Sequence, residues 1–539
     1  MTRKEIIERL NEVTKSISFI NILCEIVIRD FCGPIDILFS QNNMEHLNHK
    51  EFTFLMGLWL KNIDNKVVFD DKKHNEIFLE VYQLMEKLHF TFLKDFKFDP
   101  DVKVDLHEHF NNGNMFQETM FYSGSGAYDI QYKDTALLKY KYDREWILEN
   151  KKFEVNSLSK FYDNIKIKLQ EKLNSRKYIK NISDKEQILN LLCLKKDEIT
   201  IDNPDFSYVL EALSVNINES NNQSFNKLGD FNIYSEKPIL KIDDNTFFIP
   251  SCFALSESIY ESPFYWMQKD KKYLSIAQNN RGKVAEEITK KILEPVFGIS
   301  NIYQNIIINK TKNNQAGEID ILTFHFHKAI IFQIKSKKLT ELSKNGNLES
   351  IKNDFTKAVQ NAYEQGISCR NYLNDYKNYK FPFENENFIN RIGKILEYYI
   401  VTIVLDDYPA ITHQVHILLG NKNTELPVAI NIFDLELIAK YLPKPEKFID
   451  YISKRIKYSK SYKADNEMGY LGFHLSKGLN KPEADYITLD ASWAQLIDRK
   501  YYNELYDEKK ENINTKKIQR NDPCSCNSGM KYKKCHGKL

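Results

Sequence analysis

In the segment 317–338, Asp320, Gln333 and Lys335 have the types and spacing for phosphodiester hydrolysis. Asp320 lies on one expected strand, together with Glu318 on the same face, and Gln333 and Lys335 share a face of the next strand. A hairpin that turns at residues 327–328 would bring these groups to one end of a sheet. Carboxylate and amide oxygens suit Mg²⁺ or Mn²⁺, and a lysine beside them would orient the attacking water and offset developing negative charge.

The elements expected around these residues predict an α/β domain with a mixed sheet. We expect a helix at 282–296, strands at 302–308, 318–326 and 329–336, a long helix at 348–365 and a buried strand at 398–405. The first helix carries Gly282-Lys-Val-Ala-Glu286-Glu287, and either glutamate could be its contribution to the site, because helical phase alone does not separate them. We favour Glu286.

Glu286, Asp320 and Gln333-Ile-Lys335 resemble the three motifs of the PD-(D/E)XK nuclease superfamily, in its Mrr-like and NERD-like restriction group. The resemblance covers residues 281–405. It implies a restriction-endonuclease-like core, Mg²⁺ (or Mn²⁺) held by Glu286, Asp320 and Gln333, and catalysis with Lys335. It also implies a nucleic-acid substrate, DNA before RNA, a homodimeric state and a role in defence against foreign DNA. Glu287, Glu318 and Gln360 are additional candidates, the last as a residue behind the metal ligands or in contact with DNA.

Gln333 stands where this superfamily usually has an acid, which removes one negative charge from the site. The competing interpretation is therefore a degenerate nuclease fold that binds nucleic acid or a protein without cutting. The chain lacks a P-loop signature, which argues against a motor.

A second constellation lies at the end of the chain, where Cys524, Cys526, Cys535 and His536 form a full ligand set for tetrahedral zinc. Four protein ligands leave no position for substrate, so the expected Zn²⁺ is structural. The stretch resembles the SEC-C motif, which implies docking onto a protein partner or the ribosome. Residues 508–539 carry nine lysines and arginines against three acids, a net charge of +6. A third interpretation is thus a secretion- or ribosome-associated accessory protein.

Length and composition set the remaining expectations. The 539 residues have a formal net charge of +2, so any nucleic-acid surface must be a local patch. The N-terminus has no signal-peptide pattern and no apolar run reaches the ~20 residues that span a bilayer, which predicts a cytoplasmic protein with no membrane partner. The expected regions are a mainly helical 1–180, a mixed α/β connection at 181–280, the nuclease-like domain at 281–425, a helical extension at 426–506, a linker at 507–519 and the zinc motif at 520–539.

Overall fold

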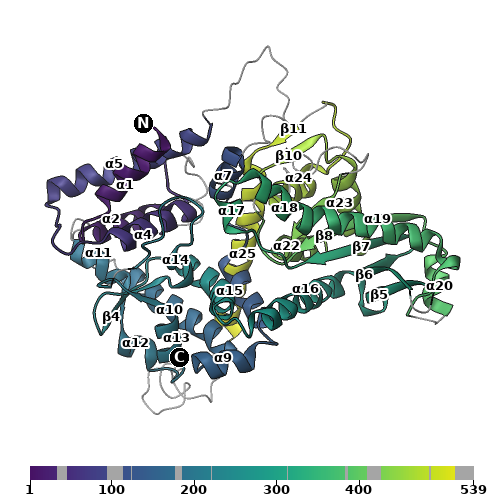
Figure 1. Cartoon of the computed structure of the whole chain (residues 1–539), viewed down its shortest axis with the longest axis horizontal. Helices are drawn as coiled ribbons and strands as arrows, with labels where there is room; N and C mark the ends of the chain where they lie inside the picture. Colours follow the sequence, from purple (N-terminus) through teal and green to yellow (C-terminus); the bar gives the residue numbers. More distant parts are fainter. Residues whose placement is uncertain are drawn as a thin grey trace, which may run out of the picture.

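The computed structural model describes residues 1–32, 45–93, 113–122, 124–175, 185–219, 221–311, 314–382, 386–408, 426–484 and 487–515. The expected zinc ligands Cys524, Cys526, Cys535 and His536 lie outside these described residues. The described chain is a mixed α/β protein in which helices predominate, as Figure 1 shows.

The described part of the N-terminal region is mainly helical. Its helices form because leucine and aromatic residues recur at helical spacing, and Leu55, Leu58 and Trp59 are fully buried in the resulting cluster. Asn48 begins one of these helices with a capping box, in which its side chain accepts from the Glu51 N–H and the Glu51 carboxylate accepts from the Asn48 N–H. The helices are α1 (Arg3–Val13), α2 (Phe19–Ile26), α4 (His49–Asn62), α5 (Asp71–Leu93), α7 (Gly113–Tyr122), α8 (Asp129–Lys139), α9 (Arg144–Lys151) and α10 (Val155–Ser175).

The connecting region is mixed, with a four-stranded sheet in the order β1-β4-β3-β2. Its strands are β1 (Cys193–Lys195), β2 (Ser214–Asn216), β3 (Ile239–Lys241) and β4 (Thr246–Phe248), and its short helices are α11 (Lys185–Leu191), α12 (Lys196–Thr200), α13 (Phe206–Ala212) and α14 (Ile233–Glu236). The long helices α15 (Cys252–Gln268) and α16 (Leu274–Phe297) then lead towards a second, larger sheet (Figure 1).

The larger sheet has five strands in sequential order, β5 (Ile302–Thr311), β6 (Asn314–His325), β7 (Lys328–Lys335), β8 (Glu397–Val404) and β9 (Val428–Asn431). The first three form an antiparallel meander, whereas β8 and β9 run parallel to β7. β9 lies beyond residue 425, so the sheet continues past the boundary expected from the sequence. A four-residue strand is too short for its pattern to reveal which sheet it joins.

Helices cover both faces of this sheet. Phe332 and Val401 pack on the face that α16 covers, together with α22 (Ile432–Tyr441) and α23 (Pro445–Lys457). Ile331 and Ile400 pack on the opposite face, under α19 (Asn361–Asn374). Gly366 of α19 permits this contact, because a Cβ there would lie 2.5 Å from the Ile400 Cγ2 atom.

The crossover from β7 to β8 is broken into pieces where the sequence predicts one helix at 348–365. It consists of α17 (Glu341–Lys344), α18 (Leu348–Phe355), a π-helical turn η4 (Thr356–Gln360), α19 and α20 (Glu386–Ile392). A π-turn inserts extra backbone and changes the helical phase of everything after it. Side-chain directions beyond Gln360 therefore cannot be extrapolated from the start of the helix.

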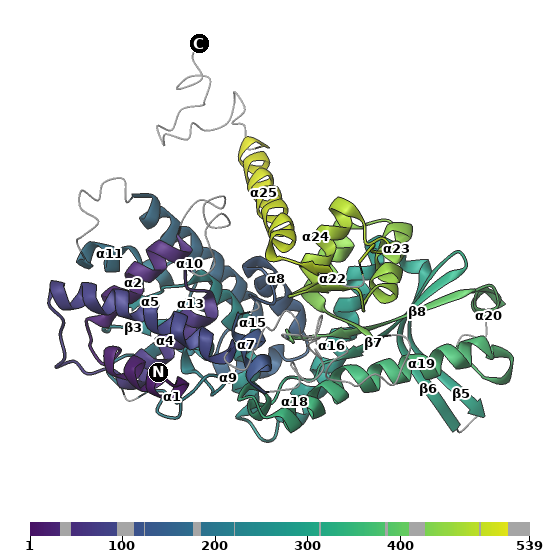
Figure 2. The ribbon, with the colours of Figure 1, turned by 90° about the horizontal axis from the view of Figure 1, so that it is seen from above.

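The C-terminal part of the described chain comprises the parallel pair β10 (Tyr462–Ala464) and β11 (Ile487–Leu489), α24 (Glu467–Lys477) and α25 (Ala491–Thr515). Figure 2 shows α25 projecting away from the rest of the protein. Its last turns extend into the segment that the sequence predicts to be a linker, because lysine and glutamate, which make that segment polar, also favour helix.

Candidate active site

The sheet opens between β6 and β7 at the position of the predicted site. Their ladder runs from His325 and Lys328 to Ile321 and Phe332 and then stops. The outer ladders continue, β5 with β6 to the end of the hairpin and β7 with β8 to Lys335. The two strands thus separate beyond Phe332 while each keeps its other neighbour.

Side chains of the predicted site bridge this opening. The Asp320 Oδ2 atom accepts a hydrogen bond from the Ile334 N–H at 2.6 Å. The Gln333 Nε2 atom donates to the Glu318 carbonyl oxygen at 2.9 Å. Asp320 and Gln333 are both buried, at 8% and 0% exposure. Each therefore supplies a hydrogen bond that the separated backbones no longer make to each other.

The opening coincides with a change in strand alternation. Asn305, on β5 beside Asp320, has a φ of 54°, in the left-handed region. Residues two positions apart on a regular strand share a face. Here Ile321 packs under α16, whereas Ile319 packs on the opposite face, in the cluster under α19. The kink explains why Asp320 does not follow a simple in-and-out pattern.

Helix α16 brings Glu286 to the opening and directs Glu287 away from it. Burial and then the charge of Asp320 raise the pKa of Glu286 to about 7, while a hydrogen bond with Gln304 opposes the shift. Glu287 instead forms an ion pair with Lys141 and accepts a hydrogen bond from the Tyr142 hydroxyl. The geometry thus separates the two glutamates that helical phase left open.

Asp320 is the second acid of the opening. Burial raises its pKa to about 6, although the Ile334 N–H and the charge of Lys335 act in the opposite direction. Glu318 adds negative charge that raises the pKa values of both Glu286 and Asp320. Carboxylates that raise one another's pKa values create a region of negative potential, which a cation would neutralise.

Lys335 lies at the same opening and is held by a residue that the sequence did not indicate. Its Nζ atom donates to the Gln365 Oε1 atom at 3.3 Å, and the Gln365 Nε2 atom donates to the Glu318 carbonyl at 3.0 Å. The Cys369 thiol lies 3.3 Å from the same carbonyl.

Gln360 makes a different contact, because its Nε2 atom donates to the Glu364 Oε1 atom at 2.8 Å. A contact of Gln360 with DNA stays a prediction. The π-turn before α19 is what brings Gln365 to the site, and the local sequence carries no clear signal for it.

The oxygen atoms at the opening fit a hard divalent cation. Among the described residues, the buried Gln333 Oε1 atom has no hydrogen-bond donor, although such atoms are normally satisfied. Together with the carboxylates of Glu286 and Asp320 it supplies the oxygen types that Mg²⁺ binds. Across the described residues, no three His, Cys, Asp or Glu side chains gather in a metal-binding arrangement. A cation here would therefore depend on the glutamine oxygen.

A buried ionic cluster fixes α16 relative to the carboxyl ends of β7 and β8. Arg281 of α16 pairs with Asp406, which follows β8, and donates to the Ser336 carbonyl, which follows β7, at 3.0 Å. Lys139 of α8 lies 3.5 Å from both Asp406 and Glu261. Burial of Asp406 opposes its ionisation, but the charges of Arg281 and the neighbouring lysines hold the pKa of Asp406 well below its usual range. The ionic cluster joins helices of the N-terminal half to the sheet edge that carries Lys335.

A groove of about 1020 Å³ begins at Lys335. One wall is the chain that leaves β7, residues 335–344, and the other comes from residues 229–236, α15 and the start of α16. Its lining contains more basic than acidic side chains. The basic ones are Lys269, Arg281, Lys335, Lys337, Lys338 and Lys344, and the acidic ones are Asp230, Glu236 and Glu341.

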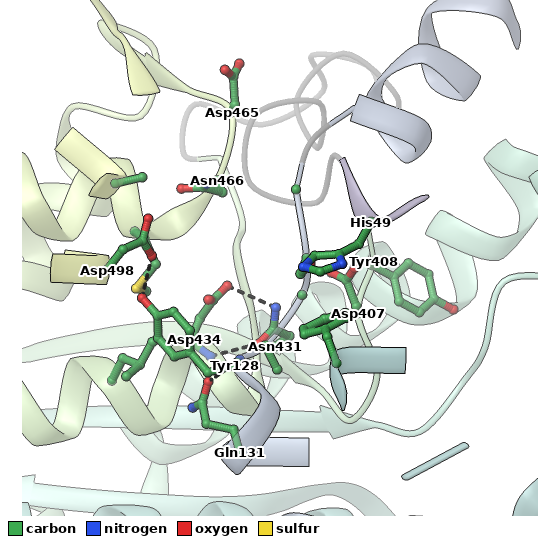
Figure 3. Close-up of a pocket in the computed structure, with 18 of the residues that line it drawn as sticks. His49, Tyr128, Gln131, Asp407, Tyr408, Asn431, Asp434, Asp465, Asn466 and Asp498 are labelled. Carbon is green, nitrogen blue, oxygen red and sulfur yellow. Dashed lines mark hydrogen bonds between the residues drawn. The ribbon is translucent and has the colours of Figure 1, made fainter. Parts of the chain in front are cut away.

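A separate cavity of about 290 Å³ has the opposite character (Figure 3). Four carboxylates line it, those of Asp407, Asp434, Asp465 and Asp498, and its described lining includes no lysine or arginine. Two of them are hydrogen bonded, Asp498 to the Tyr128 hydroxyl at 2.6 Å and Asp434 to the Asn431 amide at 3.0 Å. A phosphate backbone would be repelled here, so the groove at Lys335 is the better candidate for a nucleic-acid surface.

Comparison with known proteins identifies one region of the chain. The described chain has a mixed α/β fold. Residues 520–538 match the SEC-C motif, as the spacing of the cysteine and histidine residues predicts. No curated protein and no solved structure matches the chain. None of the described helices combines the length and the apolar composition needed to cross a membrane.

Proposed function

We propose that this protein is a metal-dependent nuclease that hydrolyses phosphodiester bonds of DNA. The observation that carries the proposal is the convergence of Glu286, Asp320, Gln333 and Lys335 at the opening between β6 and β7. The order of elements supports it, since a helix, an antiparallel meander, a helical crossover and a parallel strand are also what the resemblance to PD-(D/E)XK nucleases implies.

Each residue has a role that its contacts support. The carboxylates of Glu286 and Asp320 and the Oε1 atom of Gln333 would hold Mg²⁺ or Mn²⁺. When bound, such an ion lowers the pKa of a coordinated water and stabilises charge on the scissile phosphate. Lys335 offers an ammonium group beside the same acids, where it orients the attacking water and offsets the negative charge that develops on the phosphate. Gln365 positions Lys335 through the 3.3 Å hydrogen bond.

The C-terminal motif gives the proposed nuclease a docking segment. Zn²⁺ held by Cys524, Cys526, Cys535 and His536 would fold it, and its net charge of +6 suits an acidic partner surface, on a protein or the ribosome. A role in defence against foreign DNA rests on the analogy with restriction-type nucleases.

The proposal is tested by incubating the purified protein with plasmid, linear and single-stranded DNA and with RNA, in Mg²⁺ or Mn²⁺. We expect cleavage that Asp320→Asn, Lys335→Ala and Glu286→Gln each reduce about 100-fold or more. Glu287→Gln is the matched control, because it removes the adjacent carboxylate, which points to Lys141, and it should retain most of the activity. Cleavage that survives Asp320→Asn would refute the assigned site. A wild-type protein that binds nucleic acid but cuts none of these substrates would favour the degenerate, binding-only interpretation.

A further inference from the structure

The groove that begins at Lys335 has two kinds of lining that act on different parts of a nucleic acid. Lysines line the chain that leaves β7, and aromatic rings line the opposite wall. Most of the second wall belongs to residues 229–269, which lie outside the nuclease-like region 281–405. A role for this wall would give the connecting region a function that its sequence does not reveal.

Lys344 is the basic residue of the groove that is least satisfied within the protein. Lys269 and Lys338 form ion pairs with Glu236 and Glu261, and Lys337 pairs with Asp354. The ammonium group of Lys344 has no hydrogen-bond or ion-pair partner among the described residues, and it is only partly exposed. Burial and then the charge of Lys338 lower its pKa. An ammonium group held in this way would gain free energy from an anion brought into the groove.

The position of Lys344 is fixed by close backbone contacts. Gly229, with a φ of 94°, lies so close to the Lys344 carbonyl that any Cβ would collide with it. Gln117 of α7 donates to the same carbonyl at 3.3 Å. The preceding chain is held by Asp354, which accepts from the Thr340 N–H at 2.7 Å and from the Ser343 hydroxyl at 2.6 Å. The backbone at Lys344 is therefore held in place before any ligand arrives.

The partly exposed rings of the aromatic wall are those of Phe231 and Tyr265, while Phe264 beside them is buried. Their ring centroids lie 5.6 Å apart at an interplanar angle of 82°, and both side chains are partly exposed in the groove. Aromatic faces in a basic groove are the usual platform for unpaired bases, because every base has a flat face that stacks and the stacking tolerates any sequence. Bases within a duplex are already stacked on one another and cannot use it.

The size of the groove also distinguishes single-stranded from double-stranded nucleic acid. Its volume of about 1020 Å³ is close to that of pockets that enclose a ligand, roughly 300–1,000 Å³. Duplex recognition uses a broad open surface instead, on the order of 1,000–2,500 Å² of protein. A volume of this size is on the scale of a few nucleotides of one strand and far below that of a turn of duplex.

We propose that this groove binds single-stranded nucleic acid, with phosphates on Lys344 and Lys335 and bases on Phe231 and Tyr265, and that it feeds the strand to the opening between β6 and β7. The delivery of the strand to the opening rests on the proposed nuclease function, whereas binding in the groove does not require cleavage. Residues 229–269 thereby select an unpaired strand for the proposed site.

Binding is measured on the full-length protein in EDTA, where no metal-dependent cleavage occurs, by the fluorescence anisotropy of labelled oligonucleotides. The probes are a mixed-sequence DNA of about 20 nucleotides, longer than typical single-strand sites, the RNA of the same sequence and the DNA duplex. We expect the single strands to bind at least about tenfold more tightly than the duplex. The difference between DNA and RNA then identifies the preferred sugar.

Two variants separate the phosphate contact from the base contact. Lys344→Ala should weaken single-strand binding about fivefold and lower the slope of log affinity against log salt by about 0.7, the value for one phosphate of a single strand. Tyr265→Ala should weaken binding about fivefold or more and leave the salt slope unchanged. If Tyr265→Ala lowers the melting temperature of the protein, Phe231→Ala tests the same base contact instead. The matched controls are Lys271→Ala, an exposed lysine outside the groove, and Tyr208→Ala, a tyrosine that is 46% exposed on α13.

The outcomes separate this inference from the proposed function. Equal or tighter binding of the duplex, or single-strand binding that Lys344→Ala and Tyr265→Ala leave unchanged, overturns the inference even if the protein cuts DNA. Single-strand binding that these variants weaken supports it, even if the protein cuts nothing in Mg²⁺ or Mn²⁺. In that last case the nuclease proposal fails and the groove remains a binding site.

Discussion

At the scale of single residues, the proposed chemistry depends on acids that share a confined space. Glu286 and Asp320 have pKa values of about 7 and 6 in the folded protein, above the roughly 4 of unfolded chains. The folded state therefore binds more protons than the unfolded state between about pH 4 and pH 7, and its stability falls as the pH rises through that window. A bound cation would reverse this loss, since it replaces the protons.

The Glu286→Gln variant tests this electrostatic strain in EDTA. At pH 8 the variant lacks a charge that opposes Asp320, so its melting temperature should exceed that of the wild type by on the order of 2 °C. At pH 5 the difference should shrink, because the wild-type carboxyl is protonated there. Thermal melts at both pH values check the prediction. Glu287→Gln is the control, because it loses the ion pair with Lys141 and its melting temperature should not rise at pH 8. A Glu286→Gln protein that is more destabilised at pH 8 than at pH 5 would contradict it.

Gln333 is the residue in which this chain departs from the usual acid of the superfamily. Gln333→Glu would place a third carboxylate beside Asp320 and Glu286, and the new carboxylate would be repelled by the Glu318 carbonyl, to which the amide now donates. We expect the metal-free variant to lose about 2 kcal/mol or more of stability at pH 8 and to regain more than the wild type when Mn²⁺ is added. Melting curves across a Mn²⁺ titration measure both effects. Identical Mn²⁺ dependence in the two proteins would mean that Gln333 is not a metal ligand.

At the scale of elements, the site exists because β6 and β7 separate while their outer ladders persist. The two strands were expected to form a hairpin, and they do so up to Ile321 and Phe332. Helix α16 crosses one face of the opening and α19 the other, and the ionic cluster around Asp406 fixes α16 at the strand ends. The relative placement of these helices therefore sets the distance between Glu286 and the strand residues.

Asp406→Ala tests this tether. It leaves Arg281 and Lys139 buried without their shared partner, which should cost about 3–5 kcal/mol of stability. Replacing both charges in Arg281→Met/Asp406→Leu should cost less than the single change, because no uncompensated arginine remains. Denaturant unfolding of the three proteins gives the comparison. A double variant less stable than Asp406→Ala would show that the cluster contributes more than mutual neutralisation.

At the scale of the whole molecule, the sheet is part of a larger core. One hydrophobic cluster contains Tyr140, which follows α8, together with Phe332 of β7, Leu435 of α22 and Ile497 of α25. The region 281–405 thus shares its interior with helices before and after it in the chain. Residues 520–538 match the SEC-C motif, and the zinc expected there would fold the segment without a core of its own.

Zinc removal should accordingly affect the segment and spare the rest of the protein. Metal analysis of the purified protein should find about one zinc per chain, and Cys524→Ser/Cys535→Ser should abolish it. The main thermal transition should stay within about 1 °C of the wild type, because roughly twenty residues add little to a large core. A wild-type protein without zinc would refute the ligand assignment, and a large drop in the main transition would show that the segment packs against the rest of the protein.

Some features of this protein depend on local spacing and could be predicted from the sequence. They are the SEC-C motif at 520–538, the element order from α16 to β8 and the location of Asp320 and Gln333 on neighbouring strands, because turn positions, strand alternation and motif spacing are properties of short segments. Other features depend on contacts in the folded protein. The tertiary structure directs Glu286 rather than Glu287 to the opening, it brings Gln365 to Lys335 through a π-turn, it adds β9 to the sheet, and it places residues 229–269 opposite Lys344. These features arise from contacts between distant segments, and no local pattern encodes the phase of a helix after a π-turn or the partner of a distant wall.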